Sequence, residues 1–223
     1  MKENLTKSGK PAWVAIGLVG VWTVLAGATL VARAAHTGVT YKAELSALNE
    51  KAAGSAASGE ATFTISGDRL TIRIRAKGVS PNMEHLQHFH GFAKSDRTSR
   101  CPTARDDKNG DGIIDIVETE PAAGTTMVPF DVDPVGMSAV NDTFPRAGAG
   151  GSYSYEKTVS LKALEAAFAK QFRGQQLGLD RRVVFLHGVP TTTKLPVTVA
   201  SLDHLPAQVV LPIACGEIRK VAG

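Results

Sequence analysis

The sequence predicts an all-β domain, either an antiparallel sandwich or a barrel, behind an apolar N-terminal helix. Three observations lead to this prediction. Several short segments alternate between apolar and polar residues, Gly-rich and Pro-rich turns separate them, and one stretch alone has helical periodicity. The composition of the 223-residue chain, 43% hydrophobic and 21% charged, is that of an ordinary globular protein.

Residues 12–32 form an uncharged run that follows several lysines. A helix of that length would cross the hydrocarbon core of a bilayer. The small residues Ala32, Ala34 and Ala35 also fit a signal-peptidase site. We therefore expect residues 1–35 to be either a cleaved signal peptide or a retained signal anchor, which would make the membrane a partner. In both cases residues 36–223 form one extracytoplasmic domain, in the periplasm or cell envelope.

The formal net charge of +4 comes largely from Lys2, Lys7, Lys10 and Arg33 in this leader. The remaining chain is nearly balanced and offers no broad basic field to attract a polyanion. The sequence therefore predicts no nucleic-acid partner.

The first half of the domain shows four segments with β character. Residues 37–48 alternate loosely and are expected to form a first strand, followed by a small-residue loop at 52–59. Residues 61–66 and 70–75 alternate cleanly around Gly67-Asp68, which predicts a hairpin with one buried and one solvated face. After a break at 78–82, residues 84–91 read as a further strand.

Residues 93–150 look irregular, polar and rich in Gly, Pro and Asp, and so long a loop is usually functional. Further strands are expected at 152–159, 182–189 and 209–215. Pro212 in the last strand implies an edge position or a bulge. Leu161, Leu164, Phe168 and Phe172 recur at helical spacing and predict one short amphipathic helix.

Three of the six histidines lie between positions 85 and 90. In a strand, His88 and His90 would point to the same face, as a transition-metal site requires. His85 has the opposite parity and would join them only through a bulge. The alternative is that these are solvated or core histidines that bind nothing.

Residues 107–118 match the twelve-residue calcium loop of EF-hands. The expected oxygen ligands come from the side chains of positions 1, 3, 5, 9 and 12 and the carbonyl of position 7: Asp107, Asn109, Asp111, Asp115, Glu118 and Ile113. Gly112 permits the sharp turn. The alternative is a solvated acidic turn. Because the flanks are not clearly helical, we expect an isolated structural calcium site rather than a paired sensor.

The chain has two cysteines, Cys101 and Cys215, far apart in sequence. In an exported protein such a pair is a natural disulfide, whereas two free buried thiols would better fit a reducing compartment.

Four features together resemble the copper/zinc superoxide dismutase family: His88-Phe89-His90-Gly91, the loop cysteine Cys101, His187 at the end of a Val-rich strand, and Ala214-Cys215-Gly216. The resemblance covers residues 60–218, although most of the chain between the motifs is not recognisably similar. It implies an eight-stranded Greek-key β-barrel. It also implies copper ligands at His88, His90 and His187, a disulfide between Cys101 and Cys215, and superoxide as the substrate.

The chain departs from the family in two ways. Residues 91–150 contain no histidine, so the bridging histidine and the zinc ligands of the family are missing and no family-type zinc site is expected. Pro212, Ile213 and Ala214 occupy the positions where the family carries a substrate-guiding arginine. A fourth copper ligand would have to come from His85 or His204.

Three hypotheses follow for the function. The first is an exported superoxide dismutase-like copper protein, with or without turnover. The second is a non-enzymatic calcium-stabilised β domain for envelope interactions. The third is a copper carrier. Copper binding is better supported than fast dismutation, because the family's proton donor and guiding arginine are both absent.

Overall fold

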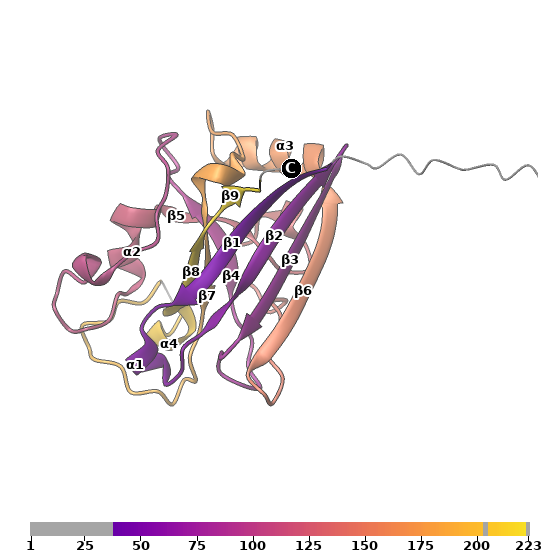
Figure 1. Ribbon diagram of the computed structural model, residues 1–223. Coiled ribbons are helices and arrows are strands. Elements are labelled where there is room, and N and C mark those ends of the chain that lie inside the picture. Colours follow the sequence, from indigo (N-terminus) through magenta and orange to yellow (C-terminus); the bar gives the residue numbers. More distant parts are fainter. Residues whose placement is uncertain (1–37, 203–204, 222–223) are drawn as a thin grey trace, which may run out of the picture. The chain divides into compact units, whose positions relative to one another are not determined.

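The computed structural model describes residues 38–202 and 205–221, and residues 36–223 form one compact unit. The chain in this unit folds into a single curled antiparallel sheet (Figure 1). Its strands are β1 (Val39–Ala47), β2 (Ser58–Ser66), β3 (Arg69–Lys77), β4 (Gln87–Gly91), β5 (Thr125–Pro129), β6 (Ser152–Ser160), β7 (Val183–His187), β8 (Pro212–Glu217) and β9 (Arg219–Lys220). The strand order is β5-β4-β7-β8-β1-β2-β3-β6, with β9 paired to β1. The prediction of an all-β domain is confirmed.

The predicted hairpin is β2 and β3, and it shows the expected division into a buried and a solvated face. Phe63 faces Ile72 and Ala61 faces Ile74 across the pair, and all four are almost completely buried. The intervening polar side chains lie at or near the surface. Gly67 has a positive φ of 58° at the turn, where glycine carries no steric cost. Strand β6 extends this sheet along the other edge of β3.

The prediction of only one helix was wrong. The amphipathic helix is present as α3 (Leu161–Gln171), and it buries Leu164 and Phe168 against the core. The structure adds α1 (Glu50–Ala53), α2 (Ile116–Ala123), α4 (Ala207–Val210) and the 3-10 turns η1 (Ala104–Asp106), η2 (Pro134–Gly136) and η3 (Leu179–Arg181). No helix within 38–202 or 205–221 is long and apolar enough to cross a membrane, and the predicted N-terminal helix lies outside these residues.

The region 93–150, expected to be irregular, contains α2 and β5. Helix α2 begins after Asp115, whose side chain accepts hydrogen bonds from the backbone N–H groups of Val117 and Glu118. Strand β5 pairs antiparallel with β4. Its five residues include Pro129 and carry no clean alternation, so the strand depends on its partner rather than on local pattern.

The last predicted strand starts later than expected, because residues 207–210 form the short helix α4. Strand β8 begins at Pro212 and lies between β7 and β1, so it is not an edge strand. The register shifts between Leu186 and His187, where His187 faces Pro212. Pro212 was predicted to lie either at a sheet edge or at a bulge, and the structure shows the second. The reason is that proline lacks the N–H that a regular ladder needs.

Strands β4 and β7 are buried along their whole length. On the core side, Phe89 packs against Phe130 and Phe168 with ring centroids 5.9 and 6.1 Å apart. On the other side, Ala123 and Cys101 from the 93–124 segment pack with Val183 and Phe185 of β7. The Cys101–Cys215 disulfide joins this segment to β8, with a Cα–Cα distance of 5.8 Å. The predicted disulfide is confirmed.

Candidate metal centre

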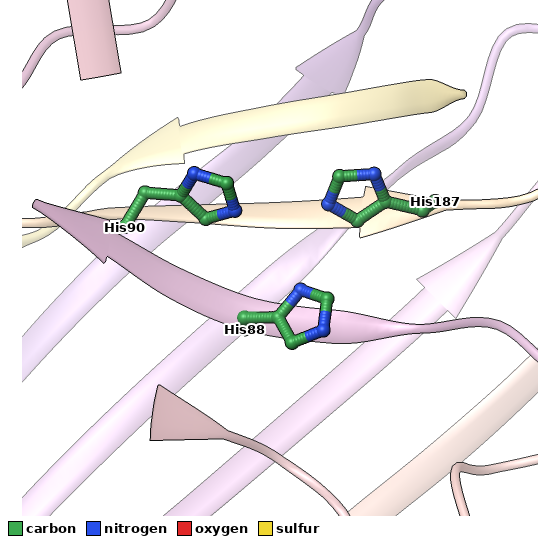
Figure 2. Close-up of side chains that lie close together, drawn as sticks. All are labelled: His88, His90 and His187. Atoms are coloured by element: carbon green, nitrogen blue, oxygen red, sulfur yellow. The ribbon is translucent and has the colours of Figure 1, made fainter. Parts of the chain in front are cut away.

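Three histidines predicted as ligands come together on the covered side of β4 and β7. His88 and His90 project from β4, two residues apart, and His187 projects from the end of the neighbouring strand β7 (Figure 2). One ring nitrogen from each lies within 4.8 Å of the others. All three are buried, with 2–4% of their surface exposed. This arrangement could hold a single metal ion.

Each of the three rings has one nitrogen against a backbone carbonyl oxygen. Nδ1 of His187 lies 2.8 Å from the Val210 oxygen, Nδ1 of His90 lies 3.2 Å from the Gly124 oxygen, and Nε2 of His88 lies 3.2 Å from the Ala139 oxygen. A carbonyl oxygen can only accept, so each contact requires the ring N–H to donate. We call this carbonyl-bound nitrogen the outer nitrogen of each ring and the other one the inner nitrogen. The hydrogen is held on the outer nitrogen, so the inner nitrogen keeps its lone pair.

The inner nitrogens face one another. Nδ1 of His88 and Nε2 of His187 are buried and have no hydrogen-bond partner in the described part of the chain. Nε2 of His90 lies 3.1 Å from the Thr126 hydroxyl. Two buried, unpartnered acceptors would cost several kcal/mol in total if nothing bound them. The arrangement fits a bound cation.

Burial also keeps these rings neutral. It lowers the pKa of His90 to about 3 and that of His187 to about 4, with the neighbouring His187 adding to the shift at His90. Burial, followed by the proximity of His187 and His90, lowers the pKa of His88 well below its usual value. A neutral imidazole is the form that binds metal, so protons compete only weakly with a metal for this site.

The metal-free protein should lose stability on acidification. The folded-state pKa values of the three histidines lie below their unfolded value of about 6.5, so the unfolded chain binds more protons below that pH. This stability is fully present above about pH 6.5 and is lost progressively as the pH falls toward about 3. The loss at about pH 5 is on the order of 2 kcal/mol for each of His90 and His187, and His88 adds to it in the same direction. Urea unfolding of metal-free protein at about pH 7 and pH 5 measures it, and identical midpoints would contradict it.

His85, one of the two alternatives for a fourth ligand, lies outside the three-histidine group. It is completely buried, and its ring nitrogens contact the carbonyl oxygens of His187 at 2.9 Å and Ser80 at 2.8 Å. Its ring stacks on Tyr153 with centroids 5.9 Å apart. The other alternative, His204, lies outside the described residues.

The predicted calcium loop has the backbone turns that its pattern requires. Gly112 adopts a φ of 82°, and its N–H donates to the Asp107 carboxylate at 2.9 Å. The Asn109 and Asp111 side chains each accept from the N–H two residues further along, at 2.9 and 2.8 Å. Glu118 reaches back across the loop, where its Oε1 accepts from the Lys108 N–H at 2.7 Å. The predicted ligand residues at the two ends of the loop therefore lie close together.

The loop is fixed to the rest of the domain. The Asn49 side chain donates to the Ile114 carbonyl at 2.8 Å and to the Pro212 carbonyl at 2.9 Å. Oδ2 of Asp115 accepts a hydrogen bond from the Ala200 N–H at 2.7 Å, while Oδ1 accepts from the first turn of α2. Among the described residues, the carboxylate oxygens of the loop are not gathered as closely as the ligand nitrogens of the three histidines.

Several groups of the histidine site escaped sequence reasoning. The carbonyls of Gly124, Ala139 and Val210 come from three separate segments, and a backbone carbonyl leaves no mark in a sequence. Phe144 packs edge-on against His88 with centroids 5.4 Å apart. The strand predicted at 209–215 overlaps the end of α4, so the sequence did not predict the helical turn that brings the Val210 carbonyl to His187.

A scan against protein-family models finds no family that matches this chain, and a search of curated proteins finds no relative. The function must therefore be argued from the site.

Proposed function

We propose that the protein binds one copper ion at His88, His90 and His187 and is a superoxide dismutase-like copper protein. The observation that carries this proposal is the orientation of the rings: the outer nitrogen of each lies on a backbone carbonyl, and the inner nitrogens of His88 and His187 have no hydrogen-bond partner among the described residues. Within the described residues the group consists of three neutral imidazoles and includes no carboxylate or thiolate, which suits copper. Cu²⁺ binds nitrogen sites more tightly than the other divalent first-row metals.

The strand order supports the family resemblance as far as the fold. Strand β3 is followed in sequence by β4 but pairs with β6, and β4 pairs instead with β5 and β7. Such exchanges of neighbours are typical of Greek-key arrangements. We infer that the curled sheet is a Greek-key barrel of the dismutase type.

A copper ion at this site would supply a Cu(I)/Cu(II) couple. Superoxide dismutation uses such a couple to oxidise one superoxide to O₂ and reduce a second, with two protons, to H₂O₂. The histidines hold the ion and keep their own protons on the carbonyl-bound nitrogens. We expect slow turnover, since the sequence lacks the guiding arginine and the bridging histidine of the family.

The deciding experiment measures copper content and superoxide dismutation on residues 36–223, which contain the whole described sheet, its core and the disulfide. About one copper per chain, bound through nitrogen in the EPR spectrum, is the expected result. Copper with fast turnover would make the protein an enzyme, and copper without turnover would indicate a carrier. Absence of copper binding would refute the proposal and leave a non-enzymatic β domain.

We further propose that the loop at 107–118 binds calcium and stabilises the domain. In support, Glu118 already reaches the start of the loop, and helix α2 leaves it as in an EF-hand. Both Asp115 oxygens accept backbone hydrogen bonds, so Asp115 would act through a water molecule. The geometry of this loop is also the observation that favours the second candidate function, an envelope interaction domain without catalysis that calcium would stabilise.

Calcium should raise the melting temperature of the parent and not that of Glu118→Gln. At about 100 times its dissociation constant, calcium would add about 2.7 kcal/mol, or roughly 5–10 °C for a domain of this size. Calorimetry with and without calcium measures the difference. Glu120→Gln is the matched control, because Glu120 is an exposed carboxylate on the same helix outside the loop. An equal calcium response in Glu118→Gln would contradict the assignment.

We propose an extracytoplasmic location for the domain, delivered by the N-terminal apolar segment. The disulfide supports it, because such bonds persist in oxidising compartments.

A further inference from the structure

The three histidines form part of the wall of a cavity of about 380 Å³. That volume is more than twice that of a cavity of about 150 Å³ known to accommodate benzene, and far larger than the space a diatomic ion needs. Apart from the histidines, most of the lining is apolar, and it includes Leu86, Ile116, Val117, Val140, Leu202 and Leu205. A cavity of this size and largely apolar lining is typical of a site for a small organic molecule.

The charge of the lining does not favour an anion. Among its described residues there is no lysine or arginine, and Glu120 is the only carboxylate. A bound copper ion would itself attract an anion, but the described lining adds no positive charge to that attraction, and Glu120 would oppose it.

The mouth of the cavity is also apolar. Val117, Val140 and Leu202 line it and are 57%, 41% and 41% exposed. They come from three separate segments: helix α2, the chain before Asn141, and the chain that follows Ser201. An apolar ligand body seated between them would remove this surface from water. The histidine nitrogens and the apolar side chains at the mouth would therefore contact two different parts of one ligand, a polar end and an apolar body.

We propose that this cavity takes a neutral organic ligand with a metal-binding donor atom at one end and an apolar body, such as an aromatic ring, at the other. The donor completes the coordination of the metal at His88, His90 and His187, and the body packs against Val117, Val140 and Leu202. This inference rests on the proposed metal site and names the class of molecule that reaches it.

The test compares two neutral ligands that differ only in an apolar body. Copper-loaded protein is titrated with imidazole and with 4-phenylimidazole, at a pH where both are neutral, and binding is followed by the visible and EPR spectra of the copper. We expect 4-phenylimidazole to bind at least tenfold more tightly. A third titration with azide, a small anion, should show binding weaker than that of 4-phenylimidazole.

Matched variants locate the effect. Val140→Asp should bring the ratio of the two affinities close to one, because it places a charge where the phenyl ring would pack. Val132→Asp should leave the ratio unchanged, since Val132 is a similarly exposed valine, at 58%, that does not line the cavity. We compare the ratio of the affinities for 4-phenylimidazole and imidazole because both ligands are neutral. A general effect of the new carboxylate on the copper would change both affinities alike and leave their ratio unchanged.

The two proposals fail in different ways. If the parent binds no copper, the metal site is wrong. If it binds copper but holds imidazole and 4-phenylimidazole equally, or holds azide more tightly than both, the metal site stands and the ligand class is overturned. A preference that survives Val140→Asp and is lost in Val132→Asp would also overturn it.

Discussion

Replacing His88 and His187 together by glutamine is expected to abolish copper binding. The two side chains supply the buried, unpartnered nitrogens Nδ1 and Nε2 that face each other across β4 and β7. Removing a single hydrogen-bond partner of a metal ligand already weakens metal binding by about 10–100-fold, so losing two ligands should cost more than roughly 100-fold. Copper titration followed by visible and EPR spectra measures the loss.

The control is Thr126→Val, which removes the hydroxyl beside His90 and keeps all three imidazoles. It should bind copper in the same stoichiometry as the parent. Melting curves of both variants establish that they remain folded. Undiminished copper uptake by the double variant would place the metal elsewhere in the chain.

Breaking the disulfide is expected to destabilise the domain strongly. Cys101→Ser removes a bridge between residues 114 positions apart, and loss of a native disulfide typically costs about 2–5 kcal/mol. The bridge also packs in a small apolar cluster with Phe185, Val183 and Ala123, next to the histidine face of β7. The 93–124 segment that it anchors ends at Gly124, whose carbonyl holds His90.

Urea unfolding of the parent and of Cys101→Ser gives the difference in free energy. Adding a reductant should destabilise the parent by a similar amount and leave the variant unchanged, which separates the lost bridge from the lost side chain. Equal midpoints for parent and variant would show that the bridge adds nothing to stability. We also expect weaker copper binding in the variant, because His90 loses part of its support.

Local sequence patterns predicted the structure correctly where all the residues that determine an element lie in one short stretch. The alternation around Gly67 predicted the β2–β3 hairpin, since side chains in a strand point alternately to opposite faces. The same rule put His88 and His90 on one face. The spacing of Leu164 and Phe168 predicted α3, and Gly112 marked the positive φ in the acidic loop.

Patterns failed where a partner from elsewhere in the chain decides the structure. Strand β5 exists because β4 offers it a ladder, and α2 because Asp115 caps it at the end of a loop that looked uniformly irregular. The alternation over 209–215 predicted a strand from Val209 onward, but residues 207–210 form a helical turn in front of Pro212, which has no N–H to give the ladder.

For the metal centre, the sequence by itself determined which residue types are available and that two of them share a face. Only a family resemblance linked them to His187. The tertiary structure decided the rest: it placed β7 beside β4, brought the carbonyls of Gly124, Ala139 and Val210 to the rings, and built an apolar cavity above them. The physical reason is that ligand orientation and cavity shape depend on backbone atoms and long-range packing, which no local periodicity encodes.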